Sequence, residues 1–321
     1  MRLLIGSLVL CLSLFGVPSA ADIHPPIDTS KKIAITFDDA PKGDGAFFTG
    51  EERSKRLVEA LSRAGVDEAL FFVRTKGLDE HGDEGEARLW RYVDAGHMLG
   101  NHSHAHMWMR RTDADVYVAG VKQAQNRLSV YENVLPLFRY PYLDEGRDPE
   151  KRTKVRTALK EMGLSNGYVT VDNYEWYMDV LAAEAKVAGK VDMDALERAY
   201  VELMIQSIEF YDGIALEALG RSPKHVLLLH ENDLAALFVD ELVLALKEKG
   251  WRIVPASEAY HDPIAGTEPE TRFNGQGRVA AIAHTMGWEP RELVHFSEDE
   301  VFLREEFQRR GILKSGAEEH P

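Results

Sequence analysis

The feature that most constrains the fold is a regular alternation of short apolar runs with amphipathic stretches, which begins at residue 32. Strand-like runs fall at 33–37, 69–73, 97–101, 137–140, 168–171, 225–229 and 251–254. Helical patterns fall between them, at 49–64, 85–95, 113–133, 150–162, 194–219 and 233–249. This alternation predicts an α/β fold in which helices cover parallel strands. About seven strand–helix units suit a barrel-like single domain better than an open sheet.

The alternation sets the domain boundaries that we expect. Residues 22–262 form the predicted barrel. From residue 263 the pattern is less regular, with one further helix expected near 297–311, so residues 263–321 are interpreted as a C-terminal appendage. The long segment from Trp176 to Ser222 exceeds what a strand connection needs and is expected to shape a cleft.

The N-terminus has the pattern of a secretory signal peptide over residues 1–21. Arg2 precedes an apolar run over 3–17, and small residues end the segment at Ala21. We therefore expect cleavage after Ala21 and a secreted or periplasmic protein without stable membrane insertion. An uncleaved anchor is the alternative, although the run is short for a membrane span.

Cysteine content and charge limit the chemistry. The only cysteine, Cys11, lies inside the signal segment, where a lipoprotein attachment site is a further alternative. The mature chain then has no thiol, so any metal site must use His, Asp and Glu. The formal net charge of −15 argues against nucleic acid and anionic membranes as partners, and a neutral glycan or a small molecule fits better.

Polar clusters stand where the predicted strands end. They are Asp38 and Asp39, then His102, His104 and His106, then residues 139–142, residues 172–176 and His230. In a barrel of parallel strands and helices, these ends meet on the face where active sites are assembled.

Two of these clusters together favour a metal site. His102 and His106 are four residues apart, so on a helical turn both imidazoles reach one ion, whereas His104 points elsewhere. Asp38 and Asp39 repel each other unless one of them binds a cation, and the other then stays near enough to take a proton from activated water. A solvated turn is the alternative for Asp-Asp before Ala-Pro, and the histidines weigh against it.

The motifs resemble those of the polysaccharide deacetylases, family four of the carbohydrate esterases, also called the chitooligosaccharide deacetylase homology family. "TFDDAP", "HSHAH", "RYPY", "DNYEW" and "LLLH" follow one another in the order and spacing of the five family motifs. The resemblance covers roughly residues 30–260 and implies a distorted (β/α)7 barrel, in agreement with the strand count.

The resemblance also implies a role for each motif residue. Asp39, His102 and His106 correspond to the metal ligands, with Zn²⁺ expected first and Co²⁺, Ni²⁺ or Fe²⁺ as alternatives. Asp38 corresponds to the general base, Arg139 to the arginine that orients it, and His230 to the general acid, with Glu175 as its supporting carboxylate. Tyr140, Pro141, Tyr142 and Trp176 correspond to substrate-binding positions, and the backbone N–H of Tyr140 to an oxyanion donor.

Two positions depart from the family pattern. Ala40 stands where glycine is usual, and Glu175 stands where aspartate usually supports the catalytic histidine. The expected function is removal of N-acetyl groups from an acetylated glycan by a metal-dependent hydrolase. The alternatives are an O-acetyl esterase acting on xylan and a glycan-binding barrel without turnover.

Overall fold

The computed structural model describes residues 31–189 and 191–314, so the predicted signal segment lies outside the described residues. The strands are β1 (Lys32–Ala40), β2 (Leu70–Val73), β3 (Met98–Asn101), β4 (Val134–Phe138), β5 (Ser165–Asn166), β6 (Lys224–His230) and β7 (Arg252–Ile253). The α-helices are α1 (Gly50–Arg63), α2 (Lys76–Asp94), α3 (Ala114–Leu128), α4 (Pro149–Glu161), α5 (Glu175–Val187), α6 (Met193–Leu219), α7 (Asp233–Glu248), α8 (Ala256–Ala259), α9 (Arg278–Thr285) and α10 (Glu300–Arg309).

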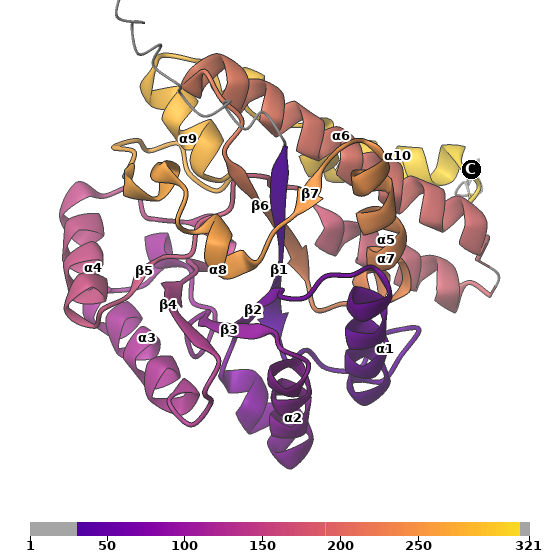
Figure 1. Ribbon diagram of the computed structural model, residues 1–321, viewed down its shortest axis with the longest axis horizontal. Helices are drawn as coiled ribbons and strands as arrows, with labels where there is room; N and C mark the ends of the chain where they lie inside the picture. Colours follow the sequence, from indigo (N-terminus) through magenta and orange to yellow (C-terminus); the bar gives the residue numbers. More distant parts are fainter. Residues whose placement is uncertain (1–30, 190, 315–321) are drawn as a thin grey trace, which may run out of the picture.

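The seven strands form one parallel sheet in the order β5–β4–β3–β2–β1–β6, and β7 also pairs with β1. β6 occupies one edge of β1 from Lys32 to Asp38, while β7 and β2 share the opposite edge. The sheet curls, and helices α1 to α4 lie along its outer side (Figure 1). The predicted α/β fold and distorted barrel are therefore confirmed.

The strand predicted at 168–171 is wrong for most of its length. β5 forms just before it, at Ser165–Asn166, and pairs with β4. The apolar residues at 168–171 are buried, but only Val171 forms a bridge, to Leu227 of β6. The apolar residues correctly predicted that this segment is buried. They did not predict whether its backbone pairs with a neighbouring strand, because that depends on the irregular geometry at the open edge of the barrel.

The helices also differ in places from the sequence prediction. α2 begins nine residues before the predicted position 85 and includes a kink at Gly82, where φ is 54°. A positive φ is inexpensive only for glycine, and the kink at Gly82 joins a first helical piece, which the sequence analysis did not predict, to the predicted one. At α1, which agrees with the helical pattern expected at 49–64, Thr49 is the N-cap, and its side chain accepts a hydrogen bond from the N–H of Glu52.

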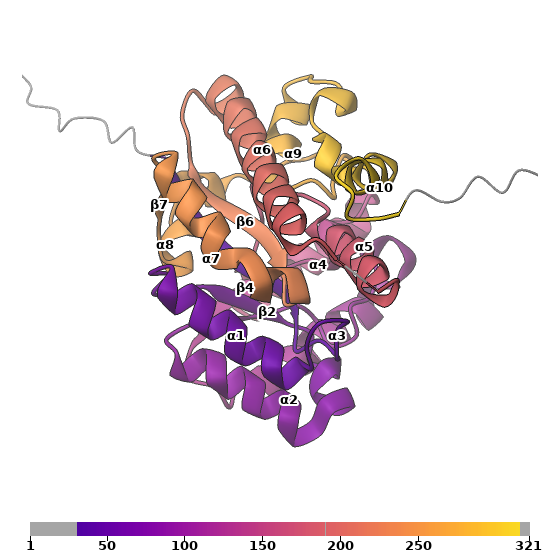
Figure 2. The same ribbon diagram turned by 90° about the vertical axis from the view of Figure 1, so that its right-hand side faces the viewer.

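Helices α5 and α6 fill the segment between residues 176 and 222. Figure 2 shows α6 crossing the molecule beside α7, with α9 and α10 on its other side. None of the described helices is long and apolar enough to cross a membrane.

Residues after 262 pack into the same core as the barrel. Leu293, Leu303 and Phe307 are fully buried within the main hydrophobic cluster. The C=O of Ser297 accepts a hydrogen bond from the N–H of Tyr174 at 3.0 Å, next to the "DNYEW" motif. The C-terminal segment thus supports the loop that carries this motif, while the domain boundary at 262 stays a prediction.

Glu298 brings a second carboxyl group into this core, beside Asp172. Tyr211 Oη and the N–H of His295 both donate to Glu298, and the backbone C=O of Asp172 accepts from Ser207 Oγ. Burial and the neighbouring charge of Glu298 raise the pKa of Asp172. Burial also raises the pKa of Glu298 to about 7, so one proton is held between two buried carboxyl groups.

This pair predicts a pH-dependent stability. A folded carboxyl with a raised pKa keeps a proton that the unfolded chain has released above about pH 4.3, so the free energy of unfolding falls as the pH rises from there toward 7. Glu298→Gln imitates the protonated carboxyl group and should remove this fall in the free energy of unfolding. For one proton, the fall is at most about 1.4 kcal/mol per pH unit. Urea unfolding between pH 5 and 8 measures it.

The control is Glu217→Gln, at an exposed position of α6. Its stability should follow the wild-type pH dependence. Parallel curves for wild type and Glu298→Gln would contradict the shared proton.

Candidate metal and catalytic site

β1 delivers both aspartates to the carboxyl edge of the sheet. Asp38 lies opposite His230 in the pairing of β1 with β6, so the register alone brings these two positions together. Asp38 is buried, and Asp39 follows with a φ of 69°. The left-handed backbone at Asp39 turns its carboxylate away from the direction that regular strand alternation would give.

The two histidines lie in the loop after β3 and not on a helical turn, so that prediction is wrong. Ser103 and His106 have φ values of 63° and 51°, which lie outside the range of a regular α-helix. The N–H of His106 donates to Ser103 Oγ at 3.0 Å, and this bond closes the loop. The imidazoles of His102 and His106 still converge, with ring centroids 4.8 Å apart, because the irregular loop folds back on itself.

Asp39, His102 and His106 form a group that can hold a metal ion. One ligand atom from each residue lies within 4.8 Å of the others. Asp39 Oδ1 lies 3.8 Å from His102 Nε2 and 3.5 Å from His106 Nε2. This oxygen is buried and has no hydrogen-bond partner among the described residues. A buried carboxylate oxygen left without a donor fits a bound cation.

The protonation of the histidines also suits a metal. Burial lowers the pKa of His106 to about 4, so its imidazole is neutral, which is the form that binds a metal. His102 Nδ1 is 2.9 Å from the C=O of Arg139, and a proton on Nδ1 leaves Nε2 as the free ligand atom. Two imidazole nitrogens and one carboxylate leave further coordination positions open.

His104 lies outside this group. Its Nδ1 is 3.1 Å from Thr75 Oγ1, and its Nε2 is 3.7 Å from Asp79. The sequence prediction that His104 points away from the other two histidines agrees with these contacts.

Arg139 contacts Asp38 on the side that faces away from the metal-binding group. Its guanidinium is fully buried and donates from Nη1 to Asp38 Oδ1 at 2.7 Å and to Thr36 Oγ1 at 3.1 Å. The other Asp38 oxygen, Oδ2, faces the metal-binding group and lies 3.6 Å from His102 Nε2. Asp38 therefore has one oxygen fixed by arginine and one directed at the site.

His230 ends β6 on the other side of the site, and Glu175 begins α5 beside it. Glu175 Oε2 is 3.2 Å from His230 Nδ1, and Glu175 is fully buried. Burial lowers the pKa of His230, but the hydrogen bond and charge of Glu175, with the charge of Asp39, outweigh burial and raise it above its ordinary value. The glutamate side chain at position 175 is therefore long enough to contact His230.

Asp38, His230 and the three residues of the metal-binding group border one cleft with a volume of about 510 Å³. Trp176 and Tyr142 line it, and the Tyr142 ring lies 4.6 Å from His106. Tyr140 and Pro141 are buried and do not border the cleft. Of the four predicted substrate-binding residues, Tyr142 and Trp176 therefore border the cleft and the other two do not.

The cleft also contains residues that sequence reasoning did not assign, namely Lys42, Asp172 and Asp179. Asp172 opens the "DNYEW" motif, and Lys42 directly follows "TFDDAP". Asp179 lies four residues after Glu175 on α5, so helical spacing could have placed both on one face. Burial raises the pKa of Asp179 to about 6.

Comparisons with known proteins bear on the family and the fold of this chain. Residues 27–167 match the family model described as polysaccharide deacetylase. No match is found among curated proteins.

Two solved structures illustrate the fold. The polysaccharide deacetylase Bc1974 from Bacillus cereus is 21% identical, with a TM-score of 0.50, and the match covers 70% of this chain and 91% of that chain. A mutant of BA3943, a pseudoenzyme of carbohydrate esterase family 4 from Bacillus anthracis, is 19% identical, with a TM-score of 0.51 and coverages of 74% and 68%. At these identities the likeness supports the fold. Residues 27–167, somewhat less than half of the chain, match the polysaccharide deacetylase family model, so this part of the chain resembles that family of hydrolases.

Proposed function

We propose that this protein is a metal-dependent hydrolase that removes N-acetyl groups from an acetylated glycan. The observation that carries the proposal is the convergence, in one cleft, of a three-ligand group, an arginine-held Asp38 and a glutamate-held His230. A protein that only binds a glycan needs neither a base nor an acid. The predicted signal peptide supports secretion or a periplasmic location, where such glycans occur.

Asp39, His102 and His106 would hold the ion, with Zn²⁺ the first candidate and Co²⁺, Ni²⁺ or Fe²⁺ the others. When bound, a divalent ion polarises the carbonyl and makes water more acidic. Asp38 Oδ2 accepts the proton of the attacking water, and the ion pair with Arg139 keeps this carboxylate in place. Protonated His230 donates to the leaving nitrogen, which otherwise departs as a poor leaving group.

Trp176 and Tyr142 supply the sugar-binding surface. An aromatic face packs against the apolar face of a pyranose ring, and both side chains border the cleft beside the ligand group. The experiment that tests the function is an acetate-release screen with each divalent metal. N-acetylglucosamine oligomers should release acetate faster than O-acetylated xylan, and release from xylan alone would favour the esterase alternative.

The ligand set is tested by removing one ligand at a time. Asp39→Ala, His102→Ala and His106→Ala should each lose the metal, because a three-ligand site tolerates no loss. His104→Ala is the matched control and should keep it. Elemental analysis of purified protein measures this, and near-stoichiometric metal in all three ligand variants would refute the assignment.

The division of labour between the two aspartates gives a second test. Asp38→Asn should retain metal and lose about 10²–10⁴-fold in kcat, which is typical for loss of a general base. Metal analysis and acetate release on the same sample separate the two effects. A metal-free Asp38→Asn protein would mean that both carboxylates are ligands.

The pair of Glu175 and His230 predicts a shift in the pH profile. The carboxylate raises the pKa of His230, so Glu175→Gln should lower this pKa and move the alkaline limb of kcat/KM to lower pH. Glu175→Asp restores the charge and should return the limb toward its wild-type position. An unchanged limb in Glu175→Gln would show that His230 does not set it.

A further inference from the structure

Lys42 places a positive charge in the cleft that the proposed reaction does not use. Among the described residues that line the cleft, it is the only lysine or arginine. Its Nζ forms no ion pair or hydrogen bond within the part of the chain that the structure describes. It follows the two aspartates by only three residues, so the same loop that carries the base and a ligand carries this charge.

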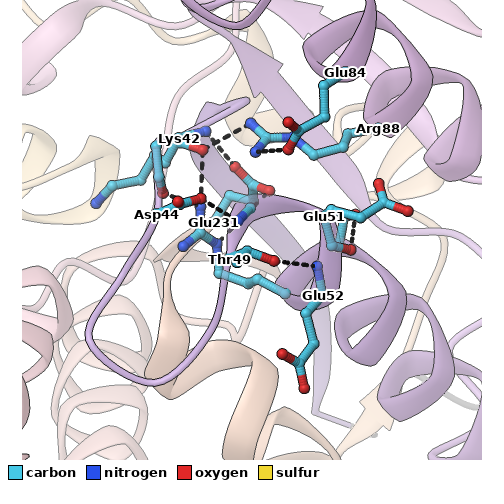
Figure 3. A network of polar contacts seen from close by, with 12 residues as sticks. Lys42, Asp44, Thr49, Glu51, Glu52, Glu84, Arg88 and Glu231 are labelled. Atoms are coloured by element: carbon cyan, nitrogen blue, oxygen red, sulfur yellow. Dashed lines mark hydrogen bonds and ion pairs between the residues drawn. The ribbon is translucent and has the colours of Figure 1, made fainter.

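The backbone of Lys42 is held from both sides. Its N–H donates to Glu231 Oε2 at 2.5 Å, and its C=O accepts from Arg53 Nη2 at 2.9 Å and Arg88 Nη2 at 2.7 Å. All three partners are buried. In Figure 3 the Lys42 side chain extends away from this network, so the anchor fixes the backbone and leaves the ammonium group free.

Two glycines, Gly45 in the loop after Lys42 and Gly50 at the start of α1, let the backbone approach these buried charges closely. A Cβ on Gly45 would lie 2.1 Å from the Asp233 carboxylate, and one on Gly50 would lie 1.5 Å from Arg88 Nη1. This close packing fixes the backbone of Lys42 beside the cleft. Less conformational entropy is therefore lost when the Lys42 side chain binds a ligand.

The acidic groups of the cleft have partners of their own. Asp38 pairs with Arg139, and Asp39 belongs to the ligand group. Asp172 shares a proton with a second carboxyl group, as described above.

Asp179 is the remaining carboxylate that borders the cleft. It accepts a hydrogen bond from the N–H of Leu234 at 3.1 Å, at the start of α7. It forms no ion pair with Lys42 within 4.0 Å in the described chain, so it does not neutralise that charge by direct contact. An ammonium group that lacks a contact partner in a recessed site favours an anionic ligand group over a hydroxyl.

We propose that Lys42 forms a subsite for a carboxylate of the glycan, so that the preferred substrate is an acetylated sugar chain that also carries carboxylate groups. This inference rests on the proposed function and names the substrate class of the same cleft. The net charge of −15 does not prevent it, because charges farther than about 8 Å are largely screened at physiological salt, whereas a contact pair in the cleft is not.

The test compares one glycan with and without carboxylates. N-acetylglucosamine oligomers and the same oligomers oxidised at C6 to carboxylates are titrated calorimetrically into metal-loaded protein, in the Asp38→Asn background to block turnover. The carboxylated oligomer should bind about tenfold more tightly than the unmodified one. In Lys42→Met this preference should disappear, so that the two oligomers bind with equal affinity. Lys42→Arg should retain most of it, and Lys122→Met, at an exposed site on α3 that does not border the cleft, should leave it unchanged.

The ratio of the two affinities separates this role from a structural one. If Lys42→Met weakens both oligomers equally, or if the carboxylate preference persists without Lys42, the subsite is refuted. The subsite is also refuted if the Asp38→Asn protein that retains Lys42 shows no preference for the carboxylated oligomer. Failure of the protein with Asp38 intact to release acetate from any glycan would instead defeat the proposed function, and the binding ratio would still decide the role of Lys42.

Discussion

The buried ion pair between Arg139 and Asp38 is the interaction on which the site depends. Arg139 also donates to Thr36, to the C=O of Gly167 and to the hydroxyl of Tyr260, so it joins β1 to β4 and to the segments that follow β5 and β7. Removing one member of a buried pair typically costs about 3–5 kcal/mol, because the other charge is left without a partner. The charge that orients the proposed base therefore also holds the barrel together at its carboxyl edge.

Around this pair, different strands of the parallel sheet supply different functional groups of the site. β1 supplies the aspartates and β6 the histidine opposite them, while the loop after β3 supplies the two imidazoles. A second set of buried charges, on α1, α2 and the start of α7, fixes the loop after β1 (Figure 3). The site thus has fixed charges on both sides of the aspartates, and such preorganised charges are what stabilise developing charge in a reaction.

Much of this could be predicted from the sequence. Apolar alternation gave the parallel α/β barrel, and polar residues at strand ends gave the site residues that the structure brings together. Spacing was a poorer guide to local geometry. The i, i+4 interval suggested a helical turn for His102 and His106, but positive φ values at Ser103 and His106 build a folded loop instead. Glu298, more than 120 residues after Asp172, gave no signal at all, because only packing joins them.

The sequence by itself determined which residue types stand at the ends of the strands, since local hydrophobic periodicity sets where a strand stops. Tertiary structure alone decided which of them meet. The register of β1 against β6 placed His230 opposite Asp38, and the packing of α5 put Glu175 against His230. Packing also removed Tyr140 from the cleft and left Lys42 facing it. Contacts between residues far apart in the chain depend on how the elements pack, and no local pattern in the chain encodes that.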